Sequence, residues 1–225
     1  MAKLIVVPTP IGNLGDITLR ALETLRAADV ILCEDTRTTR KLLSHFEITG
    51  KSCLAYHIFN EHEKTTKYID IVCQNNLTAL VSDAGTPGIS DPGYLIVKSA
   101  IEAGIEVECL PGATALIPAL IQSGFPTSSF YFYGFLPHKK GKESVLRRFA
   151  EMNETVVFYE SPHRLKKTLL KMAEIIGGER QIAIVKELSK IHAHTFRGSI
   201  EQAIDSFGED NIKGEFVLIL RSEQK

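Results

Sequence analysis

The residues best suited to holding a ligand lie between Ser82 and Gly93, a stretch rich in Gly, Pro and Asp. An apolar run ends just before it at Val81, so the stretch should be a loop that follows a buried strand. Gly lets a ligand approach the backbone closely, and Pro stiffens the chain. Open α/β sheets bind ligands at the carboxyl ends of their strands. The alternative, a purely structural turn, seldom needs so many special residues. We therefore interpret this stretch as a binding loop in which Asp83 accepts hydrogen bonds.

Three further predicted strands also end in polar or Gly- and Pro-rich loops. The strands are Lys3–Val7, Asp29–Cys33 and Ile105–Cys109, and their loops begin at Pro8, Glu34 and Leu110. If the four strands are parallel, all four loops converge at one edge of the sheet. The turn at 111–115 would then offer backbone N–H donors for a carboxylate.

Candidate proton acceptors also lie at or near strand ends. They are Glu34, Asp35, Glu160, Lys186 and Glu187. A general base must lie within hydrogen-bond reach of the proton that it removes. We assign Glu160 and Lys186 as catalytic, although an N-cap or an ion pair is the commoner role for each acid. Phe158 and Tyr159 should face opposite ways, one into the core and one into the site.

The elements that position these residues form two α/β domains. Residues 1–112 alternate strands with helices near 18–27, 36–46, 61–74 and 92–103, which predicts a mainly parallel, doubly wound sheet. Residues 113–225 begin with a helix that Pro118 should interrupt. Strands at 130–133, 155–159, 181–185 and 215–220 follow, with helices near 143–152, 162–176 and 199–207. Short connections there predict a mixed sheet.

Several segments together resemble the tetrapyrrole methylase superfamily, and within it the branch that modifies ribosomal RNA. The segments are V-P-T-P-I-G-N-L-G-D, C-E-D-T-R, V-S-D-A-G-T-P-G-I-S-D-P-G, L-P-G-A-T-A, G-F-L-P, F-Y-E-S-P-H-R-L and K-G-E-F-V-L-I-L. They run in order from Val6 to Leu220, which is nearly the whole chain.

The resemblance implies S-adenosylmethionine (SAM) as methyl donor and 2′-O-methylation of a cytidine in the decoding region of 16S rRNA. The implied partner is therefore 16S rRNA in the small ribosomal subunit. The resemblance and the loop chemistry together give the residues expected to bind the donor: Pro10, Asp83, Ala84, Gly85, Thr86, Gly112, Ala113, Thr114, Tyr159, Lys213 and Gly214. Two alternatives stay open: methylation of a tetrapyrrole or another acceptor, and a non-enzymatic SAM-binding module.

One local cluster of charge could contact RNA. The chain has a net charge of −1, which does not indicate nucleic-acid binding. The excess of basic residues between His138 and Arg148 is local, and we interpret it as a phosphate-binding segment rather than a solvated helix start. Its members are Lys139, Lys140, Lys142, Arg147 and Arg148.

The sequence also argues against several classes of site. It has neither a G-x-G-x-x-G nor a G-x-x-x-x-G-K-[ST] motif. The four cysteines and the pair His192 and His194 lack metal-type spacing, so we expect no metal. No apolar run is long enough for a signal peptide or a membrane span. We expect a cytoplasmic protein that does not contact a membrane. Because the chain ends soon after Leu220, we also expect a homodimer to help grip the RNA.

Overall fold

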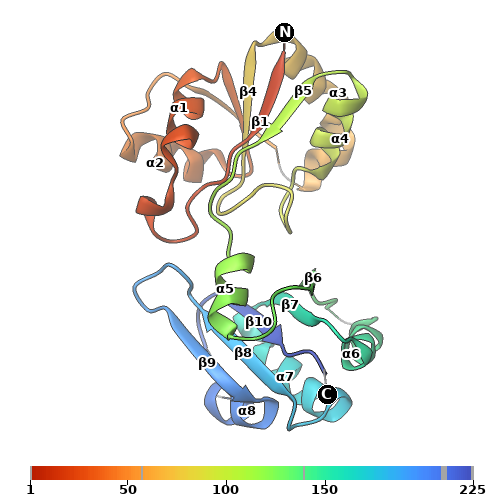
Figure 1. Cartoon of the computed structure of the whole chain (residues 1–225). Coiled ribbons are helices and arrows are strands. Elements are labelled where there is room, and N and C mark those ends of the chain that lie inside the picture. The colour runs from red at the N-terminus through yellow and green to blue at the C-terminus, as the bar shows by residue number, and fades with distance from the viewer. Residues whose placement is uncertain (1, 57, 139, 209–211, 224–225) are drawn as a thin grey trace. The chain divides into compact units, whose positions relative to one another are not determined.

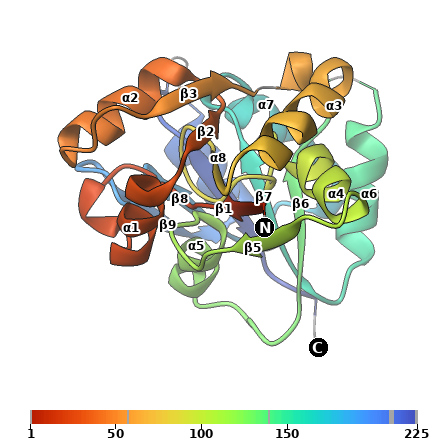
Figure 2. The same ribbon diagram turned by 90° about the horizontal axis from the view of Figure 1, so that it is seen from above.

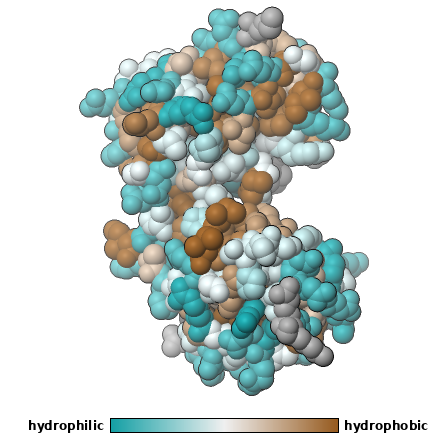
Figure 3. All heavy atoms as spheres, in the orientation of Figure 1, coloured by the Kyte–Doolittle hydropathy of each residue, from teal (hydrophilic) through white to brown (hydrophobic). Residues whose placement is uncertain are grey.

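The computed structural model describes residues 2–56, 58–138, 140–208 and 212–223, without the side chains of 58–64. The chain forms two compact units, Met1–Thr114 and Ala115–Lys225 (Figure 1). Figure 3 shows mostly hydrophilic residues on the visible face of each unit, interrupted by smaller hydrophobic patches. Among the described residues, no helix is both long and apolar enough to cross a membrane.

Unit 1 is built on a five-stranded parallel sheet. Its strands are β1 (Lys3–Val6), β2 (Val30–Cys33), β3 (Ser52–Ala55), β4 (Leu77–Val81) and β5 (Glu106–Cys109). Their order is β3-β2-β4-β1-β5, and every neighbouring pair is parallel. The parallel, doubly wound prediction is therefore confirmed. The central strands are mostly apolar because helices cover both faces of the sheet.

Helices lie on the two faces of this sheet (Figures 1 and 2). The helix α1 (Leu19–Ala27) and the helix α2 (Thr36–His45) pack on one face, where Leu22 and Leu43 meet Ile5 and Ile31. The helices α3 (Ile58–Gln74) and α4 (Tyr94–Glu102) pack on the other face. A short 3₁₀ turn, η1 (Leu14–Asp16), connects β1 to α1.

Unit 2 has a five-stranded mixed sheet, as predicted. Its strands are β6 (Phe130–Phe135), β7 (Thr155–Glu160), β8 (Gln181–Lys186), β9 (His194–Ser199) and β10 (Phe216–Leu220). The order is β6-β7-β10-β8-β9, in which only the β6–β7 pair is parallel. The strand β9 was not among the predicted strands, because its segment lacks a clear apolar alternation.

The helices of unit 2 cover its sheet unequally. One face carries α6 (Lys142–Glu151), α7 (Pro162–Ile176) and α8 (Ile200–Phe207). The other face carries α5 (Leu116–Ser123). The prediction that Pro118 interrupts this helix is wrong. Pro118 is its third residue. The N–H groups of the first turn have no acceptor within the helix, so a proline there removes no helical hydrogen bond.

Candidate active site

Two loops at the carboxyl edge of the unit 1 sheet are fastened together. The N–H of Thr9 donates to the carbonyl of Gly85, and the N–H of Gly85 donates back to Thr9, both at 2.9 Å. The Thr9 hydroxyl donates to the carbonyl of Ser82 at 3.1 Å. These three hydrogen bonds therefore fix the position of the loop after β1 relative to the loop after β4.

Asp83 lies at this edge as an exposed carboxylate with a fixed orientation. Its Oδ1 accepts the backbone N–H of Asp35 at 3.1 Å, and its own N–H donates to Oε2 of Glu34 at 3.4 Å. Burial and the nearby charge of Asp35 raise the pKa of Asp83, and the hydrogen bond from Asp35 N–H opposes them. Asp83 is therefore a hydrogen-bond acceptor that the loops after β2 and β4 hold in place.

The loop after β5 joins the same edge. The Thr86 hydroxyl donates to the carbonyl of Ala113 at 3.0 Å. Gly85 has a φ of +79°, and Gly112 lies so close to Pro8 that a Cβ would stand 2.6 Å from the Cβ of Pro8. Within the described part of the chain, the N–H groups of residues 112–114 have no acceptor. They are available for a ligand carboxylate, so this edge fits the amino-acid end of SAM.

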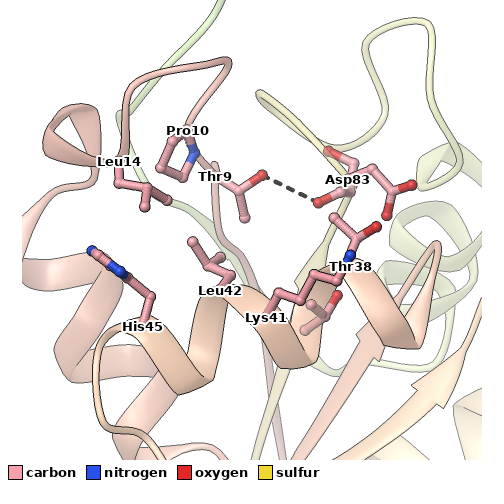
Figure 4. Close-up of a pocket in the computed structure, with 10 residues that line it drawn as sticks. Thr9, Pro10, Leu14, Thr38, Lys41, Leu42, His45 and Asp83 are labelled. Atoms are coloured by element: carbon pink, nitrogen blue, oxygen red, sulfur yellow. Dashed lines mark hydrogen bonds between the residues drawn. The ribbon is translucent and has the colours of Figure 1, made fainter.

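A pocket of about 240 Å³ opens beside Asp83 (Figure 4). It is lined by Thr9, Pro10, Leu14, Thr38, Thr39, Lys41, Leu42, His45, Ser82 and Asp83. Sequence reasoning missed the α2 residues of this set. Their spacing is the signal that could have found them, since positions 38, 41, 42 and 45 share one face of a helix.

Asp35 has the structural role that is usual for an acid before a helix. It is the N-cap of α2, and its Oδ1 accepts the N–H of Arg37 at 2.8 Å. The Arg37 side chain also pairs with this carboxylate, at 2.6 Å from Oδ2. The hydrogen bonds from Arg37 lower the pKa of Asp35 to about 2, which makes it a weak base.

The structure argues against Glu160 as the catalytic base. Its carboxylate is buried and pairs with Arg164 at 2.6 Å and with Lys142 at 3.7 Å. It also accepts the Thr168 hydroxyl at 2.6 Å and the N–H of Ser161 at 2.7 Å. A carboxylate with four partners inside the core has no access to a substrate proton, so we correct its assignment to a structural ion pair.

The other predicted unit 2 residues lie on opposite faces of the sheet. The register places Glu160 and Lys186 on either side of Phe216, and the Lys186 Nζ lies 6.0 Å from the centre of the Phe216 ring. Phe158 is buried in the core on that face, whereas Tyr159 faces α5 and packs on Phe132. The expected alternation is confirmed. Glu160 and Lys186 lie on the face of the sheet that carries Phe158, and Tyr159 lies on the other face.

The turn with Lys213 and Gly214 is held by Glu187. Glu187 Oε1 accepts the N–H of Glu215 at 2.8 Å and pairs with Lys190 at 2.9 Å. Gly214 has a φ of +119°, and a Cβ there would stand 2.8 Å from Cγ of Glu187. Burial opposes the ionisation of Glu187, but the hydrogen bonds from Lys190 and Glu215 outweigh it and lower the pKa. Lys213 is exposed on this ordered turn.

The basic cluster divides into buried and exposed members. Lys142, which we predicted to contact phosphate, begins α6 and donates to the Thr168 hydroxyl at 2.7 Å. Burial lowers the pKa of Lys142. Arg148 stacks on Tyr131, with its guanidinium 5.0 Å from the ring centre. Lys140 and Arg147 are exposed, and Lys139 lies outside the described residues.

The chain thus combines a parallel sheet that has Gly-rich loops at one edge with a second unit built on a mixed sheet. The model of the tetrapyrrole (corrin/porphyrin) methylases matches residues 3–204, and the chain belongs to this family. The resemblance seen in the sequence is thereby confirmed, and with it the SAM-dependent methyltransferase activity that it implied. No group of three potential metal-binding side chains occurs in the part of the chain that the structure describes.

Within this family, the chain is similar over its whole length to proteins named ribosomal RNA small subunit methyltransferase I. It is 48% identical to the Synechocystis protein, covering 98% of this chain and 79% of that one. It is 44% identical to the Thermotoga maritima protein, covering 100% of both. In fold it resembles the Thermus thermophilus uroporphyrin-III C-methyltransferase solved with S-adenosylhomocysteine. That comparison gives a TM-score of 0.68 at 20% identity, over 97% of each chain.

Proposed function

We propose that this protein methylates the ribose 2′-oxygen of a cytidine in the decoding region of 16S rRNA, within the small ribosomal subunit. The observation that supports this most strongly is the 44–50% identity to small-subunit rRNA methyltransferases along nearly the whole chain. Such a substrate belongs to the cytoplasm, where ribosomes assemble.

The reaction sets clear requirements for the protein. SAM supplies a methyl group on a sulfonium. The C–S bond breaks with its electron pair left on sulfur, a C–O bond forms to the 2′-oxygen, and the proton of the 2′-hydroxyl passes to solvent. Because the donor is already activated, the chain contributes mainly by positioning the two substrates and excluding water. With Glu160 buried in its ion pair, the exposed Asp83 is the better-placed acceptor of hydrogen bonds at the sheet edge.

We propose that the unit 1 loops hold the donor. Asp83 would accept hydrogen bonds from its ribose hydroxyls or balance its positive charge, and the N–H groups of residues 112–114 would receive its carboxylate. Pro10, Ala84, Gly85 and Thr86 would line the same edge. Tyr159, Lys213 and Gly214 of unit 2 remain predicted donor contacts.

The acceptor can be tested by offering several substrates at once. The protein and SAM labelled on its methyl carbon are incubated with small subunits from a strain lacking the gene, and separately with free 16S rRNA and with uroporphyrinogen III. We expect label on the RNA of the small subunits and none on the tetrapyrrole. Label on the tetrapyrrole alone would identify a different methylase, and donor binding without any transfer would identify a SAM-binding module.

A further inference from the structure

The helix α2 presents two different faces. Thr39 and Leu43, one turn apart, are buried against the rest of unit 1, and Thr39 also borders the pocket beside Asp83. A second stripe, spaced i, i+3, i+4 and i+7, lines the pocket beside Asp83: Thr38, Lys41, Leu42 and His45. Because these four residues lie on one rigid helix, α2 fixes the positions of several groups that could contact a ligand.

The lining of the pocket changes from apolar at one end to polar at the other. Figure 4 shows Leu14 and His45 at one end, Leu42 in the middle, and Thr38 and Asp83 at the other end. Leu14 is 40% exposed, which leaves an apolar surface open to a ligand. The apolar end with its imidazole ring suits a planar base. The hydroxyl and carboxylate at the opposite end suit the hydroxyls of a ribose.

The charge on α2 favours a phosphate-bearing ligand. The helix has the sequence TRTTRKLLSH, with three Arg or Lys residues and no acid. Arg37 is paired with Asp35, whereas Lys41 lines the pocket. The ammonium of Lys41, the one Arg or Lys of α2 that lines the pocket, repels a sulfonium and attracts a nucleic-acid phosphate. The stripe therefore fits the acceptor RNA better than it fits SAM.

The pocket also adjoins the proposed donor site. Thr9 lines the pocket and exchanges two backbone hydrogen bonds with Gly85 of the donor loop. Asp83 and Pro10 belong to both the pocket and the proposed donor set. Methyl transfer requires the two reacting atoms to approach to about 3–3.5 Å, so the acceptor nucleotide must bind next to the donor.

From these four observations, we propose that this pocket receives the acceptor nucleotide, with its base against Leu14 and Leu42, its ribose toward Thr38 and next to the donor contact Asp83, and a phosphate beside Lys41. The proposal rests on the proposed function, because it takes RNA as the acceptor. It adds a location and a set of contacts for the nucleotide that is methylated.

Kinetics with matched variants test the phosphate contact. Lys41→Ala removes a positive charge from the pocket, and Arg40→Ala removes one from the neighbouring position, which lies outside it. For Lys41→Ala we expect the KM for small subunits to rise about tenfold, as for loss of a charged hydrogen bond. For Arg40→Ala we expect a change below about twofold. The SAM affinity of both variants should stay at the wild-type value.

A parallel comparison tests the base contact. Leu14→Ala shortens an exposed apolar side chain, and we expect it to raise the KM for small subunits about tenfold, with unchanged SAM affinity. A loss of SAM affinity in Leu14→Ala or Lys41→Ala would assign the pocket to the donor and overturn the proposal. Equal KM values in Lys41→Ala, Leu14→Ala and the wild type would overturn it as well.

Direct binding separates this proposal from the proposed function. The methyl groups of the protein are isotope-labelled, and cytidine 5′-monophosphate is titrated in the presence of S-adenosylhomocysteine. We expect the Leu14, Leu42 and Thr38 methyl signals to shift, and those of Leu77 in β4 to stay. Shifts absent from all three pocket residues would contradict the pocket assignment, whatever the wild-type protein methylates. If the pocket residues do shift but small subunits take no label, the proposed function fails instead.

Discussion

Asp83 and Glu160 are both acids near strand ends, yet their surroundings give them different roles. Asp83 is exposed and oriented by a single backbone N–H. Glu160 is buried among two cations, a hydroxyl and an N–H. A substitution of Asp83 should therefore weaken ligand binding, whereas a substitution of Glu160 should lower stability.

At Asp83 the expected loss is in donor binding. Asp83→Ala should weaken SAM binding about tenfold to a hundredfold, because a charged acceptor of hydrogen bonds is removed. Calorimetric titration with SAM measures this, and thermal unfolding should stay cooperative. Asp70→Ala, an exposed acid on α3, removes the same charge and should leave the affinity unchanged. Equal affinities in the two variants would remove Asp83 from the donor site.

At Glu160 the expected loss is in stability. Glu160→Gln leaves Arg164 and Lys142 without a buried counter-charge, which should lower the free energy of unfolding by about 3 kcal/mol. Urea denaturation gives the value. Glu174→Gln breaks only a surface pair with Lys171 on α7 and should cost less than about 1 kcal/mol. A stable but inactive Glu160→Gln protein would restore Glu160 as a candidate base.

At the scale of elements, α2 depends on its N-cap to hold the pocket stripe in place. Asp35→Ala should lower the unfolding free energy by about 1 kcal/mol, and Asp35→Ser, which keeps a capping oxygen, should recover most of it. Denaturation and methyl transfer are measured on both variants. The Ser variant should also keep its activity. If it is stable but inactive, Asp35 takes part in the chemistry and its cap is secondary.

We expect α6 to contact RNA through fewer residues than the sequence predicted. With Lys142 buried, we expect Lys140→Ala combined with Arg147→Ala to weaken binding of small subunits. The slope of log affinity against log salt should flatten by about 1–2, since each lost phosphate contact removes nearly one unit. Filter binding at several salt concentrations measures the slope. Lys67→Ala combined with Lys98→Ala on α3 and α4 is the control of equal charge. An unchanged slope in the α6 variant would make this segment a solvated surface.

The sequence predicted those elements whose determinants are local. The strands β1, β2, β4 and β5 were identified because each ends in a polar or a Gly- and Pro-rich loop. The role of Lys142 was not predictable, because its partners Glu160 and Thr168 come from other elements. The pocket stripe of α2 was missed for a different reason. Threonine, lysine, leucine and histidine form no recognisable motif, and only the packing of Leu43 shows which helix face remains for a ligand.

At the scale of the whole molecule, the account depends on one transfer, from SAM to a ribose oxygen of 16S rRNA. Small subunits from a strain lacking the gene are methylated with labelled SAM, and their RNA is then digested with alkali and analysed by mass spectrometry. Because a 2′-O-methyl group blocks alkaline cleavage, we predict a single labelled, alkali-resistant dinucleotide with a 5′ cytidine from the decoding region. Label recovered on a base carbon or nitrogen, or spread over many nucleotides, would contradict the central claim.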